Sequence, residues 1–154
     1  MKRISLIKAT KDQIPLLVEI SKEAFDSDIE VGAIEKGGPP EYDCPEWHEK
    51  MAKEGHLYAA VENNDVIGGA ILFQDDNNSD CMYVGRIFID PKHFKKGYGI
   101  ELMRCIEEMN PLITKFFLDT PIWNRRTNNF YKKIGYIETK RDDEFVYYQK
   151  NVKK

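Results

Sequence analysis

Two glycines separate a strand-like segment from a helical one within Asp90–Met103, and no other stretch of the chain is better suited to hold a phosphate group. Residues 81–89 are rich in β-branched and aromatic side chains, whereas the apolar residues of 100–109 recur at helical spacing. The first N–H groups of a helix lack intrahelical partners, and they point outward with the positive end of the helix dipole. We therefore expect an anion to bind at this junction.

The side chains around the junction also suit an anion, and a pyrophosphate would fit them. Gly97 and Gly99 let a ligand approach the backbone closely. Positive charge comes from four neighbouring residues, Lys92, His93, Lys95 and Lys96. Because the whole chain has a formal net charge of −3, this positive patch is a local feature and does not follow from overall composition.

Spacing excludes two of the three phosphate-binding schemes that compete for this junction. The P-loop requires Gly-Lys-Ser/Thr, whereas Gly99 is followed by Ile100 and Glu101. The dinucleotide fingerprint requires a third glycine where Leu102 stands, and it opens a βαβ unit instead of following several strands. An acyl-coenzyme A loop is the scheme that is left.

The third scheme rests on a resemblance. Phe94–Gly99, with Pro91 three residues before it, resembles the acyl-coenzyme A loop of the GNAT superfamily of N-acetyltransferases, Gln/Arg-x-x-Gly-x-Gly/Ala. Phe94 departs from the pattern, because the family usually has Gln or Arg there, so a polar side-chain contact is missing. The alternative is a glycine turn on a lysine-rich, solvated surface.

A second motif is similar to the C-terminal signature of the same family. In that signature an Asn after the fifth strand is followed seven residues later by a Tyr, and then by Lys-hydrophobic-Gly-aromatic. Asn124, Tyr131, Gly135 and Tyr136 occupy these places. The motifs occur in the family's order, with the strand-like segment 115–120 between them. We therefore interpret the chain as a GNAT-type N-acetyltransferase.

The expected order of elements agrees with that interpretation. A capping-box pattern at Thr10–Gln13 precedes the first helix, and 26–44 is irregular. We predict helices at 14–25, 45–53, 97–110 and 127–134, and strands at 4–8, 56–62, 66–73, 81–89, 115–120, 136–141 and 144–150. The resemblance implies an α/β (α+β) fold, with a mixed, mostly antiparallel sheet of six to seven strands, about four helices, and splayed fourth and fifth strands. Gly85 marks either a bulge that helps to open this gap or a close-packing position.

Composition limits the other possibilities. With 154 residues, 42% of them hydrophobic, and no low-complexity linker, we expect residues 1–154 to form a single domain. Three cysteines without Cys-x-x-Cys spacing argue against a disulfide framework or a zinc site, and we expect no metal. Without a long apolar run or a signal-peptide pattern, we expect a cytoplasmic protein that does not enter a membrane. The basic residues form no long stripe, which argues against nucleic-acid binding. We expect a monomer or a homodimer.

The resemblance implies acetyl-CoA as the acyl donor, lying between the splayed strands. Its pantetheine arm would contact the backbone of Ile87, Phe88 and Ile89, and the amide of Asn124. The alternative for Asn124 is a turn or helix-cap residue. The pyrophosphate would be held by six residues of the loop and first helical turn, Lys95, Lys96, Gly97, Tyr98, Gly99 and Ile100.

The implied reaction is acetyl transfer from a thioester to a primary amine of a small molecule, a peptide or a protein. Only a neutral amine can attack, and a free alkyl amine has a pKa of about 10, so a proton must be removed. A backbone N–H near Phe88 or Ile89 would stabilise the oxyanion, by analogy with the family. Tyr131 is the candidate general acid for the departing thiolate. Its alternative role is that of a half-buried aromatic residue.

The general base and the acceptor are less well defined by the sequence. The candidate bases are Asp119, Glu41, Asp43, His48, His56 and Asp90, and a water molecule is a further possibility. Residues 26–47 contain seven acids and one base, Lys36, so they either attract a cationic amine or form a solvated loop. The alternative for the whole chain is a non-catalytic acyl-CoA-binding or regulatory domain.

Overall fold

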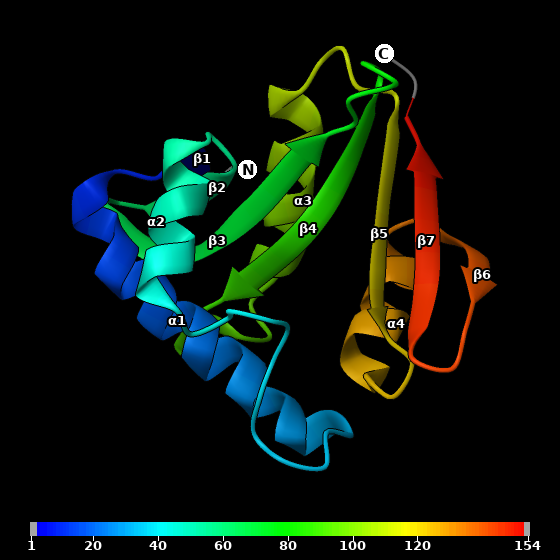
Figure 1. The fold of residues 1–154 in the computed structure, drawn as a ribbon, viewed down its shortest axis with the longest axis horizontal. Helices are drawn as coiled ribbons and strands as arrows, with labels where there is room; N and C mark the ends of the chain where they lie inside the picture. Colours follow the sequence, from blue (N-terminus) through cyan, green and yellow to red (C-terminus); the bar gives the residue numbers. More distant parts are fainter. Residues whose placement is uncertain (1–2, 153–154) are drawn as a thin grey trace.

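One seven-stranded sheet, in the order β1-β2-β3-β4-β5-β7-β6, organises the molecule in the computed structural model, which describes residues 3–152 (Figure 1). The strands are β1 Ser5–Lys8, β2 Leu57–Glu62, β3 Asp65–Gln74, β4 Cys81–Ile89, β5 Lys115–Pro121, β6 Ile137–Arg141 and β7 Phe145–Asn151. Every neighbouring pair is antiparallel except β4 and β5, which are parallel. The predicted mixed, mostly antiparallel sheet is confirmed.

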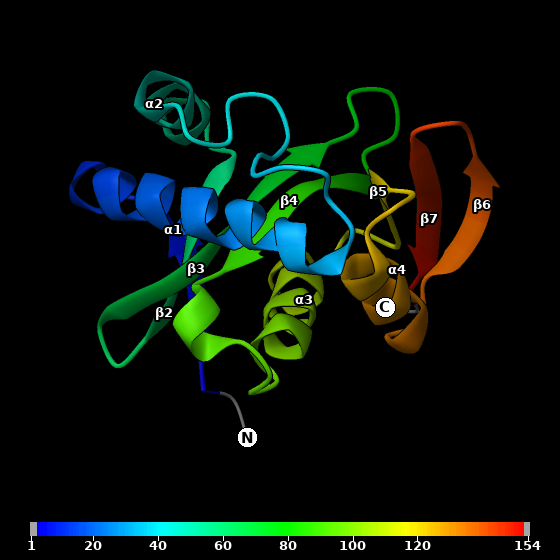
Figure 2. The ribbon, with the colours of Figure 1, turned by 90° about the horizontal axis from the view of Figure 1, so that it is seen from below.

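Four α-helices cover the two faces of this sheet: α1 Ile14–Asp26, α2 Pro45–Lys53, α3 Tyr98–Met109 and α4 Arg125–Lys133. Figure 2 shows α1 and α3 on opposite sides of the strands. Successive side chains of a strand point to opposite faces, so each strand contributes to two cores. The core under α1 and α2 includes Leu17, Ile71 and Phe88, whereas the core under α3 and α4 includes Leu102 and Phe116.

Short-range signals explain several element boundaries. The Thr10 N–H donates to Oε1 of Gln13 at 3.0 Å, as a capping box requires, and a 3-10 turn at Lys11–Gln13 leads into α1. The β2–β3 turn uses Asn63 and Asn64 at φ 49° and 71°, a left-handed conformation that asparagine tolerates.

The parallel contact between β4 and β5 is short, and the two strands then part. Only Cys81–Tyr83 pair with Lys115–Phe117, and Figure 1 shows the strands diverging beyond this point. In the β3–β4 ladder, Val84 and Arg86 pair with adjacent residues of β3, so Gly85 is the extra residue of a bulge. A Cβ at Gly85 would also lie 2.8 Å from the Phe73 ring, so both predicted roles of this glycine apply.

Three predictions about elements need correction. Helix α4 begins at Arg125 instead of 127, because the side chain of Asn124 caps it. Met109, which we placed on the apolar stripe of α3, shares the face of Leu102 but is 37% exposed, because it is the last residue of the helix. The irregular segment 26–44 contains a 3-10 helix at Ser27–Val31.

Within residues 3–152, no helix is long and apolar enough to cross a membrane.

Candidate active site

Beyond Tyr83, the edge of β4 that faces β5 is open. The Asp90 N–H donates to the Ile67 carbonyl of β3 at 2.8 Å, and backbone groups of successive residues point to alternate edges of a strand. The backbone groups of Ile87 and Ile89 therefore point to the open edge. The Phe88 carbonyl points toward β3: its oxygen lies directly beside the place that a Cβ of Gly68, a β3 residue, would occupy. Of the three residues predicted to contact pantetheine, only two present their backbone at the opening.

The N-terminus of α3 has the geometry of an anion site. Lys95 and Gly97 both have a left-handed backbone, with φ 64° and 84°, and such turns direct successive N–H groups toward one point. The first helical bond runs from the Glu101 N–H to the Gly97 carbonyl at 3.2 Å, so the N–H groups of Tyr98, Gly99 and Ile100 precede it. Lys95, Lys96 and Gly97 are exposed. These residues fit a pyrophosphate.

Sequence reasoning missed Arg3, which adds a further cationic side chain to this junction. Its guanidinium donates to the Lys96 carbonyl, pairs with Glu101 and lies 4.1 Å from the centre of the Tyr98 ring. Nothing in the sequence around Arg3 indicates this contact, because it joins the chain's start to residues more than ninety positions later.

Phe94, the departure from the acyl-coenzyme A motif, has an apolar role with a cation beside it. The ring packs against the core under α3 and α4. The guanidinium of Arg126, from α4, lies 4.9 Å from the ring centre and donates to the Ser27 carbonyl at 3.4 Å. A positive group is therefore present next to this position, although it comes from another element.

Tyr131 lies on α4 with its ring among other aromatic residues. It is 7% exposed, and its ring centre lies 5.8 Å from that of Tyr136 and 6.0 Å from that of Tyr148. Burial raises the pKa of the Tyr131 phenol well above its usual value, and the charges of Asp119 and Tyr83 add to this effect. The phenol therefore stays protonated and is able to donate a proton.

Asp119 is held by a residue that the sequence did not suggest. The Tyr83 hydroxyl, on β4, donates to Oδ2 of Asp119, on β5, at 3.0 Å. Tyr83 belongs to the last pair before β4 and β5 part, and its ring stacks on Phe73 and Phe117 with centre distances of 6.2 and 5.4 Å. The contact therefore lies where the strands separate. Only the register of β4 against β5 could have identified it.

Asn124 forms the N-cap of α4. Its Oδ1 accepts the Thr127 N–H at 3.1 Å, and the residue is 2% exposed. Asn124 therefore makes the hydrogen bond expected for its alternative role as a helix cap. Its contact with pantetheine stays a prediction.

Three of the other candidate bases, His48, His56 and Asp90, have hydrogen-bond partners of their own. His48 is fully buried, with Nδ1 2.7 Å from the Cys44 carbonyl, and Nδ1 of His56 lies 3.0 Å from the Leu72 carbonyl. Asp90 accepts the Lys92 N–H at 3.0 Å, the turn contact typical of an Asp before a proline. Glu41 has a left-handed backbone, φ 65°, in the segment between α1 and α2.

The comparison with protein families agrees with this geometry. The sequence profile of the acetyltransferase (GNAT) family matches residues 17–136. The chain belongs to the GNAT acetyltransferase family. No curated protein sequence matches it significantly.

Solved structures of other acetyltransferases have the same fold as this GNAT domain. The PaiA N-acetyltransferase of Thermoplasma acidophilum, in complex with coenzyme A, has a TM-score of 0.77 at 16% identity, over 96% of this chain and 98% of that one. A GNAT-family acetyltransferase of Streptococcus agalactiae has a TM-score of 0.83 at 16% identity, over 98% and 96%. An acetyltransferase of Thermus thermophilus has a TM-score of 0.80 at 12% identity, over 99% and 100%. At these identities the likeness shows the fold alone.

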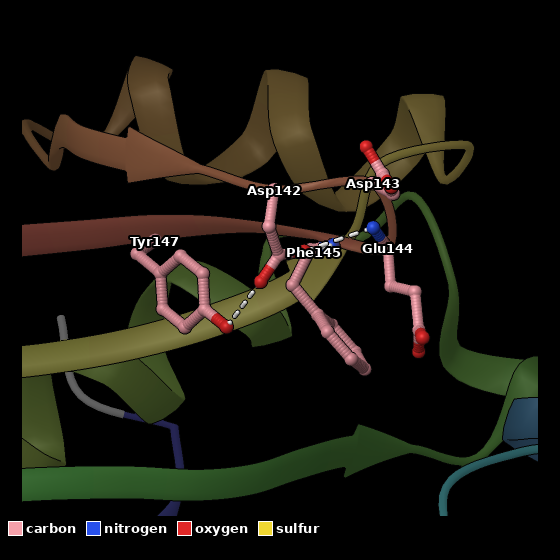
Figure 3. A pocket seen from close by; sticks show the side chains of 5 residues that line it. All are labelled: Asp142, Asp143, Glu144, Phe145 and Tyr147. Carbon is pink, nitrogen blue, oxygen red and sulfur yellow. Dashed lines mark hydrogen bonds between the residues drawn. The ribbon is translucent and has the colours of Figure 1, made fainter.

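Acidic segments flank the wide end of the β4–β5 opening in this GNAT domain. A Cβ at Gly32 would lie 2.6 Å from the Trp123 carbonyl, so the acidic segment 26–47 contacts the turn that follows β5. A hollow of about 430 Å³ lies beside the β6–β7 turn and is lined by Asp142, Asp143, Glu144, Phe145 and Tyr147. In Figure 3 the carboxyl groups of Asp143 and Glu144 point to opposite sides of the turn, whereas Tyr147 donates to Asp142 at 2.8 Å. None of the predicted site residues lines the hollow.

The described residues contain all three cysteines of the chain and no candidate metal centre. Cys81 and Cys105 are buried, as expected for core residues, and Cys44 is partly exposed. Between residues 3 and 152, no group of three or more His, Cys, Asp and Glu side chains lies close enough together to hold a metal ion.

Proposed function

We propose that the protein is an N-acetyltransferase, formed by a single domain over residues 1–154, that moves an acetyl group from acetyl-CoA to a primary amine. One observation carries the proposal. The Tyr131 phenol is close enough to Asp119 and Tyr83 to be affected by their charges, and these two residues meet where β4 and β5 part. We therefore propose Tyr131 as the proton donor and Asp119 as the proton acceptor at the apex of the opening.

Two sets of residues would hold the acyl donor. The backbone from Lys95 to Ile100 would bind the pyrophosphate, with the positive charge of Lys95, Lys96 and Arg3 nearby. The open-edge backbone groups of Ile87 and Ile89 would bind the pantetheine arm, as an added strand would bind them. When bound, acetyl-CoA supplies the thioester carbon that the amine attacks.

Asp119 is the base that we propose, with Glu41 as the second candidate. Its Oδ2 accepts from Tyr83, which fixes the carboxylate and leaves Oδ1 to take a proton from the amine. The amine nitrogen becomes acidic as its bond to the acetyl carbon forms, so a carboxylate is then basic enough to accept the proton. The N–H of Ile89 or Ile87 at the open edge is the proposed donor to the oxyanion.

Tyr131 is the proposed general acid for the departing thiolate. Burial raises the pKa of the phenol, and burial raises the pKa of a thiol for the same reason, since both anions lose hydration. The two groups therefore stay close enough in acidity for a proton to pass from the Tyr131 oxygen to sulfur. Asp119 then carries the proton taken from the amine, and passing that proton through water to the Tyr131 phenolate returns both groups to their starting states.

The acceptor would enter past the acidic segments. Residues 26–47 carry seven acids and one base, and the β6–β7 turn adds Asp142, Asp143 and Glu144. A cationic amine is attracted to such a surface before it loses its proton. The primary amine could belong to a small molecule or to a peptide or protein.

The test is release of CoA thiol during incubation with acetyl-CoA and a panel of polyamines, amino acids, aminoglycosides and peptides. We expect acetyl-CoA to raise the melting temperature of the protein. We also expect CoA to be released when at least one of the amines is present. Stabilisation by acetyl-CoA without transfer to any amine would instead indicate a non-catalytic acyl-CoA-binding domain. No stabilisation at saturating acetyl-CoA would refute the proposal altogether.

A further inference from the structure

Arg86 is a partly buried cation without a carboxylate partner. Among residues 3–152, no carboxylate forms an ion pair with it, although the chain has more acids than bases. Its Nη2 donates to the Pro40 carbonyl, and its guanidinium lies 4.3 Å from the centre of the Trp47 ring. Its Nη1 is buried and has no hydrogen-bond partner.

This arrangement is costly for a structural arginine. A buried charge loses its hydration, and proteins usually compensate with an opposite charge and a full set of hydrogen bonds. Burial lowers the pKa of Arg86 to about 10, so its surroundings do not compensate fully. Arg3 and Arg141, which are more exposed, each have a carboxylate partner. Arg86 is thus the cation whose position calls for an anion from outside.

Arg86 lies near Tyr83 and Glu41, two residues of the proposed reaction site. It follows the Gly85 bulge and pairs with Ile71, whose side chain belongs to the core under α1 and α2. Residues directly opposite in a ladder share a face, so Arg86 lies on that face of β4. Tyr83 and Glu41 are close enough to influence its charge. The segment between α1 and α2 covers it through Pro40.

We propose that Arg86 binds the carboxylate of the acceptor, so that the acceptor is an amino acid or another small amine that carries a carboxylate. This inference rests on the proposed acetyl transfer. An anion without a positive group would be repelled by Glu41 and the other acids of 26–47, whereas a zwitterion satisfies both parts of the site. Its ammonium meets the acidic segment, and its carboxylate accepts from Nη1 of the Arg86 fork.

A single water molecule offers a competing explanation. His48 is fully buried, and its Nε2 is also without a partner. Burial lowers the pKa of His48, and the nearby charge of Arg86 lowers it further. One water could therefore accept from Nη1 and donate to Nε2. In that case Arg86 has only a structural role, through its hydrogen bond to the Pro40 carbonyl, and the acceptor's carboxylate has no effect on the rate.

The experiment compares each of the twenty standard amino acids with its carboxamide, by release of CoA thiol from acetyl-CoA. Rates are corrected for the fraction of neutral amine, because amidation lowers the pKa of the amine. For the best pair, we expect kcat/KM of the acid to exceed that of the amide by about 10- to 100-fold, as one or two charge-assisted hydrogen bonds allow. Arg86→Gln should bring this ratio to about one. Arg104→Gln, an exposed arginine on α3, should leave the ratio unchanged.

The outcomes separate this inference from the proposed function. If amides and acids react equally well in the unaltered protein, acetyl transfer stands and the carboxylate site is wrong. If no amine reacts, the proposed function itself is wrong. Should Arg86→Gln fail to fold, Arg86→Lys keeps the charge but loses the fork, and we expect an intermediate ratio. A ratio that Arg86→Lys leaves at its original value would overturn the assignment of the carboxylate to the fork.

Discussion

Removing one oxygen atom from Tyr131 should stop catalysis without unfolding the protein. In Tyr131→Phe the ring keeps its contacts with Tyr136 and Tyr148, and no hydrogen bond of the hydroxyl is found among residues 3–152. The free energy of unfolding should therefore change by less than about 1 kcal/mol, which is the net value of one ordinary hydrogen bond. A general acid contributes about 10²- to 10⁴-fold to the rate, so kcat should fall by about that factor.

A control variant is available in the same aromatic cluster. The Tyr136 hydroxyl is buried and without a partner, and its ring lies 5.8 Å from that of Tyr131, but it has no contact with Asp119 or Tyr83 in the proposed mechanism. Tyr136→Phe removes the same oxygen in a similar environment, and we expect kcat to stay within about twofold of the unaltered protein.

The assay is steady-state release of CoA thiol, with the KM for acetyl-CoA measured alongside kcat and urea unfolding measured for both variants. A loss in kcat that exceeds any change in KM indicates an interaction made in the transition state. Two results would refute the reasoning: unchanged turnover in Tyr131→Phe, or an equal loss in Tyr136→Phe. The first would remove Tyr131 from the chemistry, and the second would show that the loss reflects packing.

Three further predictions concern the elements that support the site. Asn124→Ala should lower stability by about 1 kcal/mol in urea unfolding through loss of the α4 cap, and Asn124→Ser should restore most of it. Gly97→Ala should cost about 1–2 kcal/mol, because φ is 84°, and should reduce the melting-temperature rise that acetyl-CoA produces. The bond from Tyr42 to Asp26 raises the pKa of Tyr42 to about 12, above the unfolded value of about 10. Its contribution should therefore be complete below pH 10 and disappear between about pH 10 and 12, so the stability difference from Tyr42→Phe should vanish there; a difference that persists at pH 12 would contradict this.

The order of helices and strands could be predicted because its signals are local. Strand β4 has the predicted bounds, since a β-branched and aromatic run is closed by Asp-Pro at one end. The α3 junction was recognised from its glycines, because a left-handed residue such as Gly97 leaves a mark in the sequence. The start of α4 was misjudged by two residues, since an asparagine can cap a helix or end a turn.

The contacts around the opening could not be predicted, because they depend on how distant segments meet. Tyr83 and Asp119 are 36 residues apart, and Arg86 meets Pro40 across 46 residues. The direction of the Phe88 carbonyl depends on the β3–β4 register, which the Gly85 bulge shifts by one residue. None of these facts changes the hydrophobic pattern of any one element.

The register of β5 links the reactive residues to the core. Leu118 and Thr120 are buried, and Leu118 belongs to the core under α3 and α4, so Asp119 between them points to the other face of the sheet. A slip of one residue would move Asp119 into the apolar core and Leu118 to the outer face, and an unpaired carboxylate cannot be buried at tolerable cost. The alternation that buries Leu118 therefore also brings Asp119 within 3.0 Å of Tyr83. Because β4 and β5 share only three residue pairs, the register of β5 depends on its apolar pattern and on its seven residue pairs with β7, and both keep this contact in place.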